Sequence, residues 1–249
     1  MSGTTLAIGT WNVLHRVHAE NHAEPVVARW PDEAARVAAI AARVAGTLAS
    51  GASEVVCLQE VSSALRDALE AALPPTHALH AHTYPRVPRF RVATRTTLAD
   101  AREHLIILAP RGATTLHAET FAKDPGKGAL VVAARDDAIV IATHVSAGAR
   151  GPAQLERLAA LVAAHRARGL VVVAGDFNTD AARVSAALGA PCAALDPAGG
   201  PTRRFPTGLG GHDIDHLVAH GGRWRAAIVE DGGALSDHQP VRGVVELDA

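Results

Sequence analysis

The chain has 249 residues, a formal net charge of −1 and a hydrophobic fraction of 48%. The apolar content excludes an intrinsically disordered chain, and the balanced charge excludes the histone-like binding of nucleic acid by bulk positive charge. Layered α/β units often reach this length, so we expect a single domain over residues 1–249.

The two cysteines, Cys57 and Cys192, stand in separate apolar runs without CxxC spacing, which excludes a disulfide framework and a zinc cluster. The first residues, MSGTTLAIGT, lack the charged segment and apolar core of a signal peptide. No apolar run approaches the ~18 residues of a membrane span. We therefore expect a cytoplasmic monomer that makes no contact with a membrane.

Short apolar runs bounded by turn residues predict strands, in chain order, at 6–14, 54–60, 105–108, 129–134, 138–145, 170–175, 214–220 and 241–247. Helical periodicity predicts helices over 32–50, 62–73, 152–168 and 180–188, while 76–103 and 196–212 read as surface loops. Several strands follow each other directly, which excludes a purely βαβ protein. The pattern favours two packed mixed sheets with outer helices.

Polar residues end several of these apolar runs or lie just beyond them: Asn12, Glu60, His144, Asp176 with Asn178, Asp215, and Asp237 with His238. Open α/β sheets build sites from such strand ends, because the strand fixes the backbone while its end meets solvent. Each residue also has a structural explanation. Asn12 could close a turn, Glu60 could begin the next helix, and Asp176 could cap the helix at 180. The ordered set is what indicates function.

The segments TWNVL, LQEV, THVS, GDFN, IDHL and SDHQP resemble, in order, the motifs of the endonuclease/exonuclease/phosphatase superfamily. The resemblance runs from Thr10 to Pro240. It implies the deoxyribonuclease I-like fold, a four-layer α/β/β/α sandwich whose site lies at one edge between the two sheets.

The resemblance also implies roles for the residues. Glu60 is expected to be the main carboxylate ligand of Mg²⁺ or Mn²⁺, with Asn12 and Asp237 completing its shell; oxygen ligands suit such hard cations. Asp176 is expected to position and deprotonate the attacking water. Three further residues are expected to donate to phosphate oxygens or to the leaving group: Asn178, His144 and His238. Asp215 is expected to orient the ring of His238.

The sequence differs from well-known branches of this superfamily, and the differences disfavour some substrate classes. The continuation TDAARVSA after GDFN and the presence of His144 disfavour an apurinic-site endonuclease. A secreted deoxyribonuclease or sphingomyelinase is disfavoured because we find neither a signal peptide nor an apolar membrane-facing hairpin.

Other residues are candidate substrate contacts. His15, His18 and His22 follow Asn12 closely and could bind a transition metal, but a polar loop explains them too; His15 is the candidate contact among them. The arginines of 86–102, with Arg89 and Arg91 as candidates, could bind a polyanion or form a solvated loop. Arg203 and Arg204 stand in the loop before Asp215 and are further candidates.

The sequence therefore predicts a divalent-metal-dependent phosphoesterase that hydrolyses phosphodiester bonds, with DNA or RNA as the leading substrate. One alternative is a phosphatase or phosphodiesterase of a small cytosolic phosphate ester, such as a nucleotide, sugar phosphate or inositol phosphate. Another is a catalytically silent binding module. The GKGAL segment at 126–130 lacks the first glycine of a phosphate loop and leads into a strand, so we exclude nucleotide binding by that route.

Overall fold

Two mixed β-sheets pack face to face in the computed structural model, which describes residues 4–94, 96–207 and 210–248. The six-stranded sheet has, in spatial order, β12 (Gly222–Val229), β13 (Val241–Leu247), β1 (Thr5–Asn12), β2 (Val55–Ser62), β4 (Glu103–Pro110) and β3 (His77–Thr83). The five-stranded sheet has β11 (Asp215–His220), β8 (Leu170–Asp176), β7 (Ala138–His144), β6 (Gly128–Arg135) and β5 (Thr114–Thr120). Two short strands, β9 (Arg203–Arg204) and β10 (Gly211–His212), form a separate pair.

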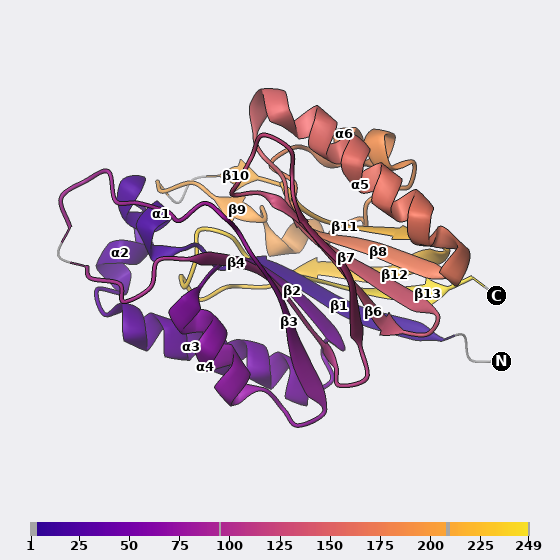
Figure 1. The fold of residues 1–249 in the computed structure, drawn as a ribbon, viewed down its shortest axis with the longest axis horizontal. Helices are drawn as coiled ribbons and strands as arrows, with labels where there is room; N and C mark the ends of the chain where they lie inside the picture. Colours follow the sequence, from indigo (N-terminus) through magenta and orange to yellow (C-terminus); the bar gives the residue numbers. More distant parts are fainter. Residues whose placement is uncertain (1–3, 95, 208–209, 249) are drawn as a thin grey trace.

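Helices cover the outer face of each sheet (Figure 1). Helices α3 (Glu33–Ala49) and α4 (Ser63–Ala72) lie on the six-stranded sheet, and α5 (Gly151–His165) and α6 (Ala181–Leu188) lie on the five-stranded one. This arrangement confirms the predicted four-layer α/β/β/α sandwich. The remaining helical pieces are short: α1 (Arg16–Asn21), α2 (Val26–Arg29), η1 (Gly148–Arg150), η2 (Arg166–Arg168) and η3 (Pro197–Gly199).

Three apolar layers hold the sandwich together. Along β2, Val55 and Cys57 face the core between the sheets, whereas Val56 and Leu58 face the helices α3 and α4. Successive side chains of a strand point to opposite faces, and both faces of this sheet are covered. That is why the central strands read as unbroken apolar runs rather than as alternating ones.

The N-caps of the long helices are residues other than Asp176 and Glu60. Asp32 caps α3, the hydroxyl of Ser62 caps α4, and Asp180 caps α6 by accepting from the Arg183 amide. The cap of α6 is therefore Asp180 and not Asp176, and Glu60 is not the cap of α4. The structural explanations considered for Asp176 and Glu60 do not hold.

The prediction of an irregular loop over 76–103 is wrong for its first part. Strand β3 pairs antiparallel with β4 along its whole length, from His77 opposite Pro110 to Thr83 opposite His104. Its sequence, HALHAHT, has no apolar alternation because it is an edge strand that is only partly buried. The predicted loop over 196–212 contains the short strands β9 and β10.

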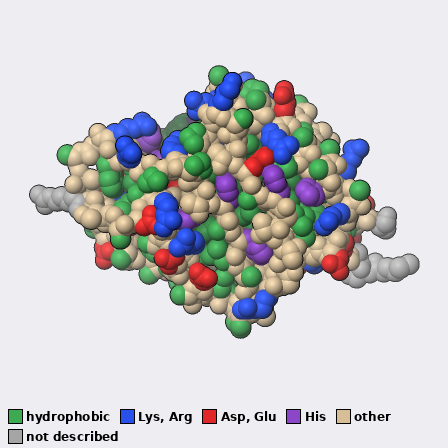
Figure 2. All heavy atoms as spheres, viewed as in Figure 1, with side chains coloured by type: hydrophobic (Ala, Val, Ile, Leu, Met, Phe, Trp, Pro, Cys, Tyr) green, Lys and Arg blue, Asp and Glu red, His purple; other side chains and the backbone are tan. Residues whose placement is uncertain are grey.

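The parallel pairs β1 with β2 and β7 with β8 bring their carboxyl ends to the same end of the sandwich. Helices α1 and α2 lie at this end, and the chain enters and leaves at the other (Figure 1). On the face seen in Figure 2, basic and acidic side chains are intermixed, in keeping with the net charge of −1. No helix in the described part of the chain is both long and apolar enough to cross a bilayer.

Candidate active site

Strand register brings three predicted residues together in the five-stranded sheet. Asp176, at the end of β8, pairs with His144 of β7 on one side and with Asp215 of β11 on the other. The preceding residue, Gly175, permits this: a Cβ there would lie 2.0 Å from the carbonyl oxygen of Thr143. Only glycine lets β8 approach β7 so closely.

Asn12 joins the two sheets at this end. Its Nδ2 donates to Asp176 Oδ2 over 3.0 Å, and its Oδ1 accepts from the Leu14 amide, also at 3.0 Å. Both Asn12 and Asp176 are buried. The amide thus closes a turn, as its structural explanation required, and also contacts the carboxylate.

Glu60 owes its position to an irregularity in β2. The register of β2 against β4 shifts between Leu58 and Val61, and Glu60 has φ of 57°. A positive φ is strained for a residue with a side chain, and a bulge redirects the side chain it carries. Glu60 Oε2 accepts from the His15 amide at 3.2 Å, and Oε1 lies 3.9 Å from His144 Nε2. No hydrogen bond to Oε1 comes from the described residues.

The carboxylates of Glu60 and Asp176 are both ionised at neutral pH. Burial alone would raise the pKa of Glu60, but the positive charges of His18, His144, Lys127 and His238 outweigh it and hold the pKa well below its usual range. The pKa of Asp176 is likewise lowered, since its hydrogen bond and attraction to His144, with the charges of His238 and Lys127, overcome burial.

Asp215 and His238 form a buried pair. Asp215 Oδ2 lies 2.8 Å from His238 Nδ1. Burial would lower the pKa of His238, but the charge of Asp215, the hydrogen bond to it, and the charges of Asp237 and Asp176 raise that pKa to about 10. The ring is therefore an imidazolium whose second nitrogen, Nε2, lies 3.9 Å from Asp176 Oδ2 and 4.0 Å from Asp237 Oδ2.

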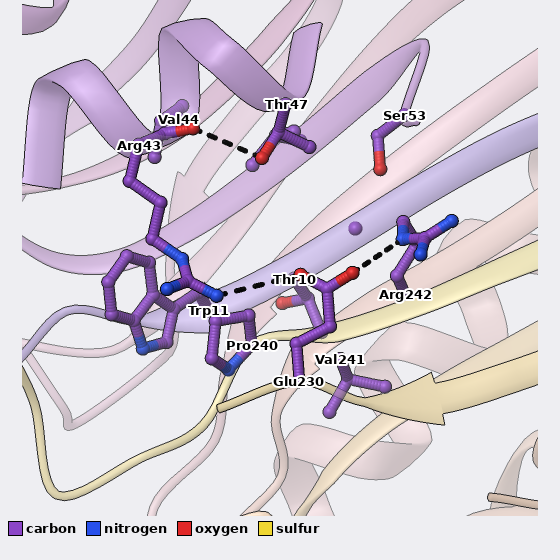
Figure 3. Close-up of a pocket in the computed structure, with 12 residues that line it drawn as sticks. Thr10, Trp11, Arg43, Val44, Thr47, Ser53, Glu230, Pro240, Val241 and Arg242 are labelled. Atoms are coloured by element: carbon purple, nitrogen blue, oxygen red, sulfur yellow. Dashed lines mark hydrogen bonds and ion pairs between the residues drawn. The ribbon is translucent and has the colours of Figure 1, made fainter. Parts of the chain in front are cut away.

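Trp11 supports the segment that carries His238. Its Nε1 donates to the carbonyl oxygen of His238 over 3.0 Å, and the guanidinium of Arg43 lies 5.7 Å from the centre of the indole. Figure 3 shows Arg43 beside Trp11, with Glu230 between Arg43 and Arg242. The small pocket that these residues line holds about 30 Å³, room for one water, and it contains none of the predicted site residues.

Asp237 is held by an arginine that we predicted to bind substrate. Asp237 Oδ2 accepts from Arg203 Nε at 2.9 Å, and the same guanidinium lies 3.6 Å from Glu24. Arg203 therefore positions Asp237 in this structure. Arg204 lies 3.5 Å from Asp231 and lines a groove of about 310 Å³ together with the exposed ring of Phe205.

Asn178 lies directly after the strand end with φ of 50°, a conformation that asparagine tolerates better than most residues. Its amide N–H donates to Asp176 Oδ1 and its Nδ2 donates to the carbonyl oxygen of Val145, both over 2.9 Å. The residue therefore holds Asp176 Oδ1, whereas Asn12 contacts Oδ2.

The three early histidines do not converge on a metal site. The ring of His15 is buried and caps α1, accepting from the Val17 amide. His18 Nε2 instead lies 2.7 Å from Glu103 Oε2. Among the described residues, the one group of three or more His, Cys, Asp or Glu side chains whose ligand atoms come within metal-binding distance of one another is Asp176, Asp215 and His238. Arg89 and Arg91 lie outside this cluster, in a groove beside α1.

Sequence reasoning missed two charged residues close to the predicted ones, Lys127 and Glu103, and considered His18 only as one of three histidines that could bind a transition metal. Lys127 Nζ contacts His144 Nε2, because Gly128 at the start of β6 pairs with His144 at the end of β7. The antiparallel register of two adjacent predicted strands could have placed Lys127 here. No local signal distinguishes Glu103.

A model of the endonuclease/exonuclease/phosphatase family matches residues 9–238. A family member from Bacteroides thetaiotaomicron is similar in structure, with a TM-score of 0.68, 15% identity and 100% of both chains covered. The human Nocturnin catalytic domain with bound sulfate anion gives a TM-score of 0.64 at 14% identity, covering 98% of this chain and 93% of that one.

D. rerio TDP2 complexed with single strand DNA product gives a TM-score of 0.60 at 14% identity, covering 98% of this chain and 99% of that one. No curated protein matches the chain. At these identities the structural similarities concern the fold. Since the family model spans most of the sequence, the chain belongs to the endonuclease/exonuclease/phosphatase family, whose members are phosphoric-ester hydrolases.

Proposed function

We propose that this chain is a divalent-metal-dependent phosphodiesterase that acts on nucleic acid. One observation carries the proposal: a single ionised carboxylate oxygen, Asp176 Oδ2, accepts from Asn12 and lies 3.3 Å from His144 and 3.9 Å from His238. A phosphodiester is anionic and repels a nucleophile, so its hydrolysis needs a base surrounded by cationic donors. The cluster supplies both.

Asp176 positions the attacking water and accepts its proton. At rest its pKa is well below neutrality, which makes it a weak base. A bound phosphate brings a negative charge next to Asp176 and engages the neighbouring cations. Both changes raise the pKa of Asp176 toward neutrality, where it accepts a proton more readily.

His238 donates from Nε2 to a phosphate oxygen or to the leaving group. Asp215 holds the ring in place through Nδ1. Lys127, just before β6, supplies further positive charge to the phosphate, His144 of β7 offers its ring nitrogen, and Asn178 contributes through its side-chain amide. These donors stabilise the charge that grows on the phosphate oxygens as the water attacks.

The donor set fits a hard divalent cation. Glu60, Asn12 and Asp237 offer oxygen atoms at one end of the sandwich, and Glu60 Oε1 accepts no hydrogen bond from the described residues. We propose that these three residues hold Mg²⁺ or Mn²⁺. Such an ion, when bound, acts as a Lewis acid on a phosphoryl oxygen.

One neighbour supports nucleic acid as the substrate class: D. rerio TDP2 is complexed with single strand DNA product. Human Nocturnin with bound sulfate anion supports only a tetrahedral anion such as phosphate. A small phosphate ester is the second candidate substrate. The grooves described above are open, and an open groove does not favour a small ester over a nucleic-acid strand. A silent binding module is disfavoured because the predicted base and metal carboxylate are both present. Cytoplasmic location, a monomer and one domain over 1–249 stay predictions.

Cleavage of end-labelled single- and double-stranded DNA and RNA with Mg²⁺ or Mn²⁺ tests the proposal. We expect cleavage that stops with EDTA and returns when the metal is restored. Bis(p-nitrophenyl) phosphate, which needs no recognition of a base or sugar, tests the chemistry separately. If it is hydrolysed while every nucleic acid stays intact, the small-ester alternative takes the place of the nuclease. If nothing is hydrolysed, the proposal is wrong.

A further inference from the structure

A second cationic site lies next to the cluster. A groove of about 690 Å³ runs between α1 and the segment 85–91, and its lining includes His18, His22, Arg86, Arg89 and Arg91. No carboxylate of the described residues lines it. His18 pairs with the buried Glu103, so the positive charge without a counter-charge in the lining is that of the three arginines.

The three arginines of this groove lie together and lack a carboxylate partner in the described part of the chain. Some exposed arginines elsewhere contact a carboxylate, such as Arg157, which lies 2.8 Å from Glu119. Others, such as Arg166 and Arg168, have no carboxylate partner among the described residues but do not line this groove. Arg86, Arg89 and Arg91 are exposed and form no ion pair with a carboxylate of the described residues. Three unpaired guanidinium groups in one groove are what a phosphate-binding surface requires.

The arginine segment is held in place by α1. Asn21 donates from Nδ2 to the Arg89 carbonyl oxygen at 3.0 Å and accepts from the Arg91 amide at 2.7 Å. Glu20 accepts from the hydroxyl of Thr94 at 2.6 Å. Helix α1 is in turn tied to the site by its N-cap residue His15, whose amide donates to Glu60 Oε2 over 3.2 Å. These contacts fix the groove relative to the cluster, so binding a strand orders little additional chain.

Arg86 connects the groove to the cluster. Its amide donates to the Pro125 carbonyl oxygen at 3.0 Å, and its guanidinium lies so close to Gly126 that a Cβ there would be 2.3 Å from Arg86 Cζ. The next residue, Lys127, contacts His144 inside the cluster. Lys127 and Arg86 thus place positive charge next to each other between the cluster and the groove.

Apolar surface alternates with the arginines. Pro85 and Val87 line the same groove and are exposed, Val87 to 44%. A polyphosphate of a polyol has little apolar surface to place against these side chains. A nucleic-acid strand alternates phosphates with sugars and bases, and so matches both kinds of contact.

We propose that this groove binds the backbone phosphates of a nucleic-acid strand on one side of the phosphate that is cleaved. The inference rests on the proposed function and names how that site recognises an extended substrate. Arg89 and Arg91 contact the neighbouring phosphates, and Arg86 lies between them and Lys127.

Binding of a fluorescein-labelled oligothymidylate to the full chain in EDTA tests this without any hydrolysis. Three proteins are compared: wild type, Arg89→Ala/Arg91→Ala, and the matched control Arg166→Ala/Arg168→Ala. The control removes two exposed arginines of η2, just before β8 and so at the other end of the strand from Asp176.

We expect the groove variant to bind at least about tenfold more weakly than the control, since charge-assisted contacts to phosphate are lost. The plot of log affinity against log salt should become shallower by about 0.7 for each phosphate contact removed. In the presence of metal, the ratio of kcat/KM for oligothymidylate to kcat/KM for bis(p-nitrophenyl) phosphate should fall in the groove variant and not in the control.

Equal affinity of all three proteins would overturn the inference. So would displacement of the labelled strand by inositol hexakisphosphate as effectively as by unlabelled oligothymidylate at equal phosphate concentration, because charge alone would then explain binding. Neither result contradicts the proposed chemistry, because that is tested separately by hydrolysis of bis(p-nitrophenyl) phosphate by the wild-type protein.

Discussion

His144 Nε2 lies 3.3 Å from Asp176 Oδ2, and the same nitrogen contacts the ammonium group of Lys127. One ring nitrogen cannot accept a hydrogen bond from Lys127 and donate one to Asp176 at the same time. Lys127 and Asp176 therefore compete for this ring nitrogen. In the proposed mechanism, an incoming phosphate would offer new acceptors to Lys127 and His144 and so free the carboxylate for the attacking water.

Replacing Lys127 should weaken catalysis. We expect Lys127→Met to lower kcat/KM for bis(p-nitrophenyl) phosphate by about tenfold or more, because a charge-assisted contact to the phosphate is lost. Lys127→Arg should retain part of the rate. The other lysine of the chain provides a matched control: Lys123 is exposed, and Lys123→Met should keep the wild-type rate. Equal losses in the two methionine variants would contradict a specific role for Lys127.

The proposed base and metal ligand are tested by isosteric amides. Asp176→Asn and Glu60→Gln should each lower the rate by about a hundredfold or more, since a positioned base alone contributes at least that factor. Circular dichroism of each variant checks the fold, and a Mn²⁺ titration should show weaker metal binding for Glu60→Gln than for the wild type. A purified, folded variant with near-normal activity would rule out the assigned role.

Asp215 and His238 should behave as one unit. We expect Asp215→Asn and His238→Gln to reduce activity each by a large factor, and the double variant to be little worse than the more damaged single one. In urea unfolding with EDTA, Asp215→Asn alone should lower the free energy of unfolding by about 3 kcal/mol or more, because the substitution leaves the buried imidazolium of His238 without its carboxylate partner. Additive losses in a double-mutant cycle would show that the two residues act separately.

His104 gives a prediction for stability against pH. The ring is fully buried between the hydroxyls of Ser63 and Thr83, and burial, assisted by the charges of Arg66 and Arg102, lowers its pKa from 6.5 to about 4. The folded protein therefore favours the neutral ring. Its contribution to stability is complete above pH 6.5 and is lost as the pH falls through about 4.

Urea unfolding between pH 7 and 4 should show this loss in the wild type and less of it in His104→Gln. The difference between the two curves should change by up to about 3 kcal/mol over this range, as the shift in pKa requires. Parallel curves would mean that the ring is not kept neutral by the fold.

The sequence by itself determined the layers and most of the site. Continuous apolar runs such as 170–175 require a strand covered on both faces, and the periodicity of 32–50 requires a helix with one buried face. Both signals are local, so the four-layer sandwich and its main elements were predicted. The order of the polar strand ends likewise predicted a site that contains Asn12, Asp176 and His238.

Only the tertiary structure decided how these residues are used. The bulge that turns Glu60 inward, the contact of Lys127 with His144, and the pairing of Arg203 with Asp237 all depend on the register between strands that are distant in sequence. The edge strand β3 and the arginine groove depend on neighbours that supply hydrogen bonds from elsewhere in the chain. A local pattern carries periodicity and composition, whereas these features arise from which segments meet.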